Sequence, residues 1–200
     1  MKSKINEVEV KFSPISLLKE IARKSIHISA CAVALILIAN DFVILETLFL
    51  PAMALGFYIS EKIEFFGKNI SFGNRRKWGG ILLAIGLSLV MAAPVDYEVK
   101  KFAILTLMIA DVMAALIGKI IPIRKVEVLG AYKSIGGSIA FMIGLVIAIR
   151  LSIGPIPDIG IIRVILSLPV LGMLEFLNWR GIDNVTLPIA TMVIGQLVFI

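Results

Sequence analysis

Long apolar stretches, separated by short polar ones, fill most of the 200-residue chain. Stretches with so few charges are typical of helices that cross a membrane. A helix needs about 17 to 25 residues for that crossing, and several stretches lie at or below the lower bound. Ser13-Pro14, as cap and first turn, gives the first helix extra length. The seven apolar stretches are residues 26–39, 42–60, 79–95, 102–122, 137–153, 160–177 and 184–200.

The first residues follow a different pattern. Charged and apolar residues alternate from Glu7 to Phe12, which fits either a short strand or a mobile N-terminal arm within residues 1–14. Beyond them the chain contains no internal repeat and no low-complexity linker. We therefore predict a single all-α domain over residues 1–200, a polytopic integral membrane bundle of about seven transmembrane helices.

The cations predict how this bundle is oriented. With seven spans, 16 Lys and Arg residues fall on the side of the N-terminus. The opposite side holds only four, Lys100, Lys101, Arg150 and Arg163. Cytoplasmic loops carry an excess of Lys and Arg, so we expect a cytoplasmic N-terminus, an external C-terminus and a multi-pass protein of the cell membrane.

The amino-acid composition limits which metal sites and ligands the chain can have. The chain is 59% hydrophobic and only 17% charged, with a mean hydropathy of +1.00. One cysteine and one histidine exclude thiolate clusters and multi-histidine metal sites. Any metal should be a hard ion held by carboxylates and phosphates, most plausibly Mg²⁺. The net charge of +6 suits membrane lipids and phosphorylated ligands alike, and no nucleic-acid motif is present.

Two polar clusters begin helices on the predicted cytoplasmic side. Arg23, Lys24 and His27 lie at the mouth of the first span, and Lys77, Gly79 and Gly80 enter the third. Both clusters fit snorkelling cations and interfacial anchors. Both also fit phosphate binding, with an imidazole donor in the first and a close backbone approach at the glycines of the second.

The third cluster centres on Asp111, well inside the fourth span. A carboxylate at that depth costs about 2.5–3.5 kcal/mol, so it should face protein or water and be paired. Around it, the chain offers the parts of a metal–triphosphate site: a carboxylate for Mg²⁺, and amide, hydroxyl and ammonium donors for oxygens. Helix packing, with Asp111 bridged to a lysine, is the alternative. The accompanying residues are Gly118, Lys119, Lys133, Ser134, Gly136, Gly137 and Ser138.

The fourth cluster links the last two spans. Glu175 ends one of them, and Asp183-Asn184 begins the next. Asp183 fits a helix cap equally well. As functional groups, Glu175 would be a second metal ligand and Asp183 a base. Glu46, nearer the outer face, has no assigned role. We expect the four clusters to converge on one site.

The ordered set of motifs resembles the polyprenol kinases, which include dolichol kinase and phytol kinase. The motifs run from Arg-Lys-x-x-His through basic-x-Gly-Gly, Asp-x-x-Ala-Ala-x-x-Gly-Lys and Lys-Ser-x-x-Gly-Ser to Asp-Asn, between about residues 20 and 190. They correspond to Arg23, Lys24, His27, Lys77, Gly79, Gly80, Asp111, Ala114, Ala115, Gly118, Lys119, Lys133, Ser134, Gly137, Ser138, Asp183 and Asn184.

The resemblance implies a CTP-dependent kinase that phosphorylates the hydroxyl of an isoprenoid or related lipid alcohol. It implies that CTP binds the region from Asp111 to Ser138. From the charges alone, a cytidylyltransferase that makes a CDP-lipid stays open, and so does a small transporter with Asp111 as its coupling-ion site. The sequence also leaves open whether the bundle forms a homodimer, and it does not separate CTP from ATP on physical grounds.

Overall fold

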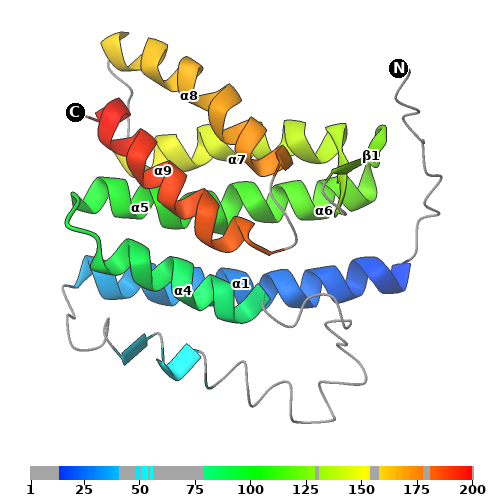
Figure 1. Ribbon diagram of the computed structural model, residues 1–200, viewed down its shortest axis with the longest axis horizontal. Helices are drawn as coiled ribbons and strands as arrows, with labels where there is room; N and C mark the ends of the chain where they lie inside the picture. Colours follow the sequence, from blue (N-terminus) through cyan, green and yellow to red (C-terminus); the bar gives the residue numbers. More distant parts are fainter. Residues whose placement is uncertain are drawn as a thin grey trace.

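The fold is a bundle of helices with one small hairpin (Figure 1). The computed structural model describes residues 14–40, 48–49, 51–53, 55, 79–128, 131–153, 158–177 and 181–199. Most of the predicted second span lies outside these residues, as do residues 1–12, Glu46 and Lys77. The helices are α1 (Pro14–Ala39), α4 (Gly79–Ala92), α5 (Tyr97–Leu105), η1 (Thr106–Asp111), α6 (Val112–Ile120), α7 (Ile135–Ile153), α8 (Asp158–Leu177) and α9 (Asp183–Phe199).

Helix α1 begins at Pro14, as predicted, and runs for 26 residues. Proline suits this position because its fixed φ matches the helix and its missing N–H is not needed in the first turn. The buried side of α1 repeats every three or four residues, and its first half is polar. The buried residues are Glu20, Lys24, His27, Cys31, Ala34, Leu37 and Ile38. A helix that buries charge in this way must face polar partners.

Helices α5, η1 and α6 form one continuous helix, Tyr97–Ile120, at the centre of the bundle. Helix α1 packs along α5 and α6, α7 packs along the whole length, and α9 packs against α5 and η1. Phe102, Phe141 and Leu145 are completely buried in the apolar core. The segment η1 is a π-helix that ends at Asp111. Such wide turns inside α-helices are often found at functional sites.

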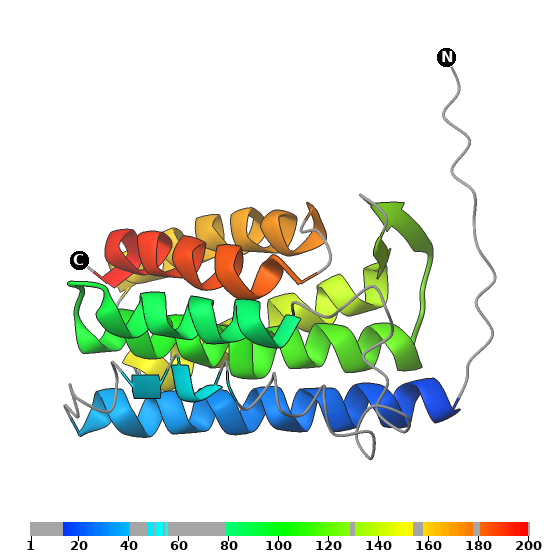
Figure 2. The ribbon, with the colours of Figure 1, turned by 60° about the horizontal axis from the view of Figure 1, so that its bottom comes forward.

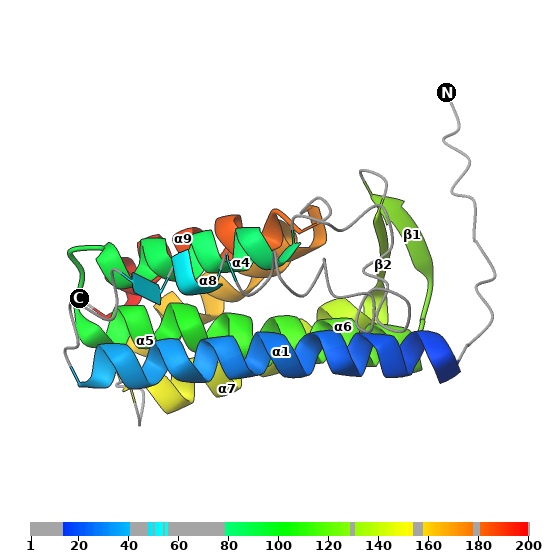
Figure 3. The same ribbon diagram turned by 90° about the horizontal axis from the view of Figure 1, so that it is seen from below.

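Three helices among the described residues are long and apolar enough to cross a membrane: Pro14–Ala39, Tyr97–Ile120 and Ile135–Ser152. Helices α4 and α9 are apolar but shorter. Figures 1, 2 and 3 show α4, α8 and α9 ending short of the hairpin end of α1 and α6. The predicted helical membrane fold is therefore confirmed in outline, and the bundle has a step where α4, α8 and α9 end.

A β-hairpin connects α6 to α7, where the sequence analysis expected only a loop. Strand β1 (Lys125–Val128) pairs antiparallel with β2 (Ala131–Ser134), with Val126 opposite Lys133. Valine and tyrosine favour strands, and alternation within Lys-Val-Glu-Val suits a two-sided ribbon. Figure 3 shows the hairpin running across the helix axes at the end of the bundle. The hairpin therefore lies next to the place where α4, α8 and α9 end.

Candidate functional site

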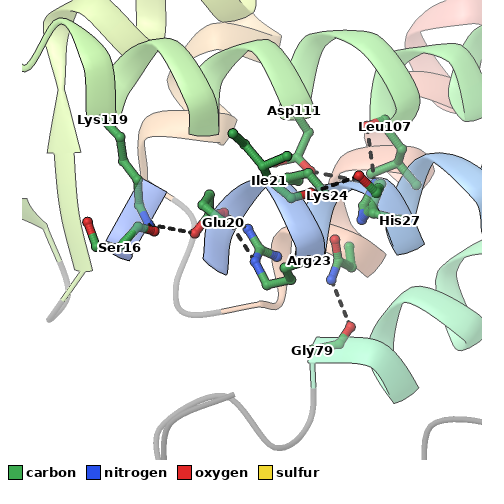
Figure 4. Close-up of polar contacts among 12 residues, drawn as sticks. Ser16, Glu20, Ile21, Arg23, Lys24, His27, Gly79, Leu107, Asp111 and Lys119 are labelled. Carbon is green, nitrogen blue, oxygen red and sulfur yellow. Dashed lines mark hydrogen bonds and ion pairs between the residues drawn. The ribbon is translucent and has the colours of Figure 1, made fainter. Parts of the chain in front are cut away.

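The centre of the polar cluster is an ion pair between two long helices. Asp111, at the end of η1, accepts a hydrogen bond from the ammonium group of Lys24 on α1, 87 residues away in sequence (Figure 4). Lys24 is 2% exposed and Asp111 is 7% exposed. The expectation that Asp111 is paired within the bundle is confirmed, and its partner is a residue of the first cluster.

His27 completes this centre. Its Nε2 donates a hydrogen bond to the carbonyl oxygen of Leu107 at 3.2 Å and lies 3.6 Å from Oδ2 of Asp111 (Figure 4). The ring is buried. Leu107 and Asp111 are four residues apart, so one imidazole contacts two successive turns of the central helix. The arrangement fixes the rotation of α1 against η1.

Glu20, on α1, organises the side of the cluster nearest the hairpin end. It accepts hydrogen bonds from Arg23, three residues later, and its Oε2 lies 2.9 Å from Nζ of Lys119 on α6. Lys119 also donates to the carbonyl oxygen of Ser16 at 2.9 Å (Figure 4). The sequence analysis did not select Glu20. Its spacing from Arg23 and Lys24, at three and four residues along a helix, was the available signal.

A second ion pair connects the hairpin to α8. Nζ of Lys133, on β2, donates to Oε1 of Glu175 at 2.5 Å, and the two residues are 42 positions apart. Glu175 is 6% exposed, and its Oε2 has no hydrogen-bond partner among the described residues. The charges of Asp111 and Asp183 lie within electrostatic reach of Glu175. A buried carboxylate oxygen of the second ion pair thus retains an unused acceptor position.

The start of α9 adds the fourth cluster. Asp183 lies within electrostatic reach of Asp111, Lys24 and Lys133. Its Oδ1 accepts a hydrogen bond from the backbone N–H of the next residue, Asn184, at 3.0 Å, whereas the predicted cap would bond an N–H two or three residues further on. The Asn184 side chain donates to the carbonyl oxygen of Gly79 at 2.9 Å, which joins α9 to the first residue of α4. The third and fourth clusters and Gly79 therefore meet beside α1.

The small residues of the third cluster serve helix packing. Ser134 caps α7, because its Oγ accepts the N–H of Gly137 at 3.1 Å, and the same hydroxyl donates to the carbonyl oxygen of Gly118 at 3.3 Å. A Cβ on Gly136 would lie 2.3 Å from the carbonyl oxygen of Ile121, and one on Gly137 would lie 2.9 Å from that of Ala114. Without side chains at these positions, α6 and α7 pack closely.

Three predicted residues lie at the edge of this arrangement. Ser138 donates to the carbonyl oxygen of Ser134 at 3.4 Å, within its own helix. Gly80 is half-buried in the first turn of α4. Gly79 has open space where its Cβ would be. The close approach that the sequence analysis assigned to the glycine pair occurs instead at Gly86, where a Cβ would lie 1.9 Å from the carbonyl oxygen of Asn184.

The cluster fits Mg²⁺ only as part of a metal–phosphate complex. No group of three or more His, Cys, Asp or Glu side chains in the described part of the chain is arranged to hold a metal ion. Mg²⁺ in proteins is commonly held by one or two carboxylates together with substrate phosphates. Asp111 and the free oxygen of Glu175 meet that smaller requirement, and Lys24 and Lys133 supply counter-charges for phosphate oxygens.

The comparisons with known proteins find no relative for this chain. No family model, no curated protein and no solved structure matches it.

Proposed function

We propose that this chain is a multi-pass membrane enzyme that uses CTP and Mg²⁺ to phosphorylate the hydroxyl of an isoprenoid or related lipid alcohol. In this proposal the bundle has seven spans, a cytoplasmic N-terminus and an external C-terminus, and the cluster faces the cytoplasm. One observation carries it: residues from separate motifs that resemble polyprenol kinases lie, together with Glu175, in one cluster of acids and cations, in which Lys24, Asp111 and Glu175 are buried. Lys24, Asp111, Lys133, Glu175 and Asp183 come from five different elements.

The roles follow from the placement of these charges. Asp111 and Glu175 would hold Mg²⁺, which when bound neutralises charge on the phosphates of the nucleotide. Lys24 on α1 and Lys133 on β2 would bind phosphate oxygens, with Arg23 adjacent to Lys24 in sequence. His27, through its contacts with Leu107 and Asp111, would keep the carboxylate oriented.

Asp183 is the proposed acceptor of the proton from the lipid hydroxyl. The hydroxyl oxygen forms a bond to the γ-phosphorus as the bond from that phosphorus to the β,γ-bridging oxygen breaks. The products are the lipid phosphate and CDP, and the proton moves to the carboxylate of Asp183. Positioning and charge neutralisation account for most catalysis of such transfers.

The apolar exterior supports a lipid substrate. Helix α8 carries a row of exposed apolar side chains on the face opposite the buried Glu175, and the row ends at the same level of the helix; it comprises Ile162, Ile165, Leu166, Val170 and Met173. A hydrocarbon tail along this row would bring a terminal hydroxyl to the level of the cluster. The length of the tail is open in this proposal.

The assay that tests the proposal follows the fate of the nucleotide. Purified chain in detergent is incubated with Mg²⁺ and CTP labelled at the γ-phosphate, together with a panel of lipid alcohols that includes a polyprenol, geranylgeraniol and phytol or, in parallel, with a phospholipid acid. A kinase transfers label to the lipid and releases CDP. Release of pyrophosphate when the phospholipid acid is the substrate would instead indicate a cytidylyltransferase. If neither labelled lipid nor pyrophosphate forms with any alcohol or acid, a CTP-dependent enzyme is refuted.

A further inference from the structure

The cluster contains two ion pairs, each between a lysine and a carboxylate. Lys24 on α1 pairs with Asp111 on η1, and Lys133 on β2 pairs with Glu175 on α8. Each pair joins elements that are far apart in sequence, and the carboxylates of both pairs are buried. The charge of Asp183 interacts with both lysines, so the two pairs belong to one electrostatic unit.

One of the two pairs, that of Lys133 and Glu175, is incompletely bonded. Oε2 of Glu175 has no hydrogen-bond partner in the described residues, although the side chain is buried. A lysine ammonium group has three donors, and one carboxylate oxygen uses only part of that capacity. Buried ion pairs persist best when further bonds satisfy the remaining lone pairs and protons. The pair of Lys133 and Glu175 therefore has bonding capacity left for a ligand that carries both charges.

We propose that the two ion pairs are the ligand-free form of a site for a divalent metal bound to a nucleoside triphosphate, and that both pairs exchange partners when this complex binds. The carboxylates of Asp111 and Glu175 pass to the metal, and the ammonium groups of Lys24 and Lys133 pass to phosphate oxygens. The inference rests on the proposed function for the identity of the ligand, and it adds how the site is kept charge-balanced inside an apolar bundle.

Strong coupling between metal and nucleotide follows from this exchange. A metal ion alone would take the carboxylates and leave two ammonium groups without partners, the buried one of Lys24 and the half-buried one of Lys133. A metal-free nucleotide would take the lysines and leave two buried carboxylates. Because a buried unpaired charge is strongly unfavourable, each half-ligand binds weakly, whereas the complete complex gives each of the two carboxylates and each of the two ammonium groups a new partner of opposite charge.

The experiment measures binding rather than turnover. The full chain in detergent or nanodiscs, without lipid alcohol, is titrated with Mn²⁺ alone by EPR, with CTP in EDTA by equilibrium dialysis, and with each in the presence of the other. We expect each ligand to tighten the other by about 10- to 100-fold. Independent binding of the two would overturn the exchange but leave the kinase proposal intact. No CTP binding even with Mn²⁺ would overturn both.

Variants of the second pair separate exchange from a structural role. In the ligand-free site, Lys133 competes with the metal for the carboxylate of Glu175. Lys133→Met removes this competition, so Mn²⁺ alone should bind about tenfold more tightly, and the coupling between Mn²⁺ and CTP binding should fall. Glu175→Gln should tighten metal-free CTP in the same way. These are gains in affinity, which loss of structure does not produce. Reduced or unchanged single-ligand affinity in both variants would contradict the proposal.

Two controls make the comparison matched. Lys133→Arg retains the charge and should retain the coupling, although the geometry of the donor changes. Lys101→Met removes a lysine that also pairs with a glutamate, Glu98, at the other end of the bundle. Its affinities for Mn²⁺ and CTP should equal those of the wild type. A Lys101→Met protein with the same gain in metal affinity would show that the effect is one of net charge alone, and would overturn the assignment to the cluster.

Discussion

The two ends of the central helix Tyr97–Ile120 use lysine in different ways. Near its start, Lys101 lies 3.7 Å from Glu98, three residues away, with side chains 27% and 47% exposed. Around Asp111 and beyond, lysines pair with carboxylates 87 and 42 residues distant, and those carboxylates are buried. Exposed local pairs contribute little to stability, whereas breaking a buried pair leaves a costly charge.

The lysines near the start of the central helix have a structural task that accounts for their positions. Lys100 donates to the carbonyl oxygen of Met91 at 2.7 Å, and Lys101 donates to that of Ser152 at 3.3 Å. Met91 and Ser152 lie in the last turns of α4 and α7, where carbonyl groups lack helical partners and the helix dipole favours cations. The comparison teaches that position and partner, rather than residue type, distinguish a helix anchor from a candidate site.

The largest expected effect is at the centre of the cluster. Asp111→Asn leaves the buried ammonium group of Lys24 without its counter-charge, so the free energy of unfolding in detergent should fall by about 3–5 kcal/mol. Glu98→Gln removes the carboxylate of the partly exposed pair, and the fall in the free energy of unfolding there should stay below about 1 kcal/mol. Thermal or denaturant unfolding of both variants checks the difference. Equal losses would remove the distinction between the two ends.

A second difference concerns glycines on α4. Gly86→Ala places a methyl group 1.9 Å from the carbonyl oxygen of Asn184, so α4 and α9 must separate. The free energy of unfolding should fall by about 1–3 kcal/mol. Gly79→Ala has open space at its Cβ and serves as the matched control. Unfolding midpoints measure both, and a Gly86→Ala variant as stable as Gly79→Ala would show that the close contact between these helices is wrong.

The smallest expected change in stability is at the N-cap of α7. Ser134→Ala removes the acceptor for the N–H of Gly137, and the free energy of unfolding should fall by about 1 kcal/mol. Ser29→Ala removes an exposed hydroxyl that donates to the carbonyl oxygen of Ser25 in its own helix, and the change in the free energy of unfolding should stay within about 0.5 kcal/mol. Hydrogen exchange at the first turn of α7 reports the cap directly. Unchanged exchange there in Ser134→Ala would contradict the capping role.

Much of the helical framework could be predicted from the sequence. The apolar stretches locate α1, α4 and α9 well, and Pro14 marks a helix start. The need for a partner at Asp111 also followed from its depth in an apolar run. The identity of that partner did not, because it depends on the rotation and register of α1 against the central helix. Those are set by packing of side chains from distant segments.

Other features left only weak signals. The π-turn of Thr106–Asp111 has no glycine or proline to mark it, and Gly86 and Gly144 look like any glycine in an apolar run. Their function appears only with their neighbours, since a Cβ on Gly144 would lie 2.6 Å from Cα of Ala110. The hairpin β1–β2 was missed because its strands are only four residues each. Four residues are too few for the alternation of apolar and polar residues to distinguish a strand from a loop.

One measurement tests the central claim that the buried cluster, and not the opposite end of the bundle, carries phosphoryl transfer. Wild type, Asp111→Asn and Lys101→Met are reconstituted in parallel and assayed for transfer of γ-phosphate label from CTP to a lipid alcohol in Mg²⁺. We predict wild-type rates for Lys101→Met and a loss of at least about 100-fold for Asp111→Asn in protein shown to be folded. Undiminished transfer by folded Asp111→Asn would contradict the account.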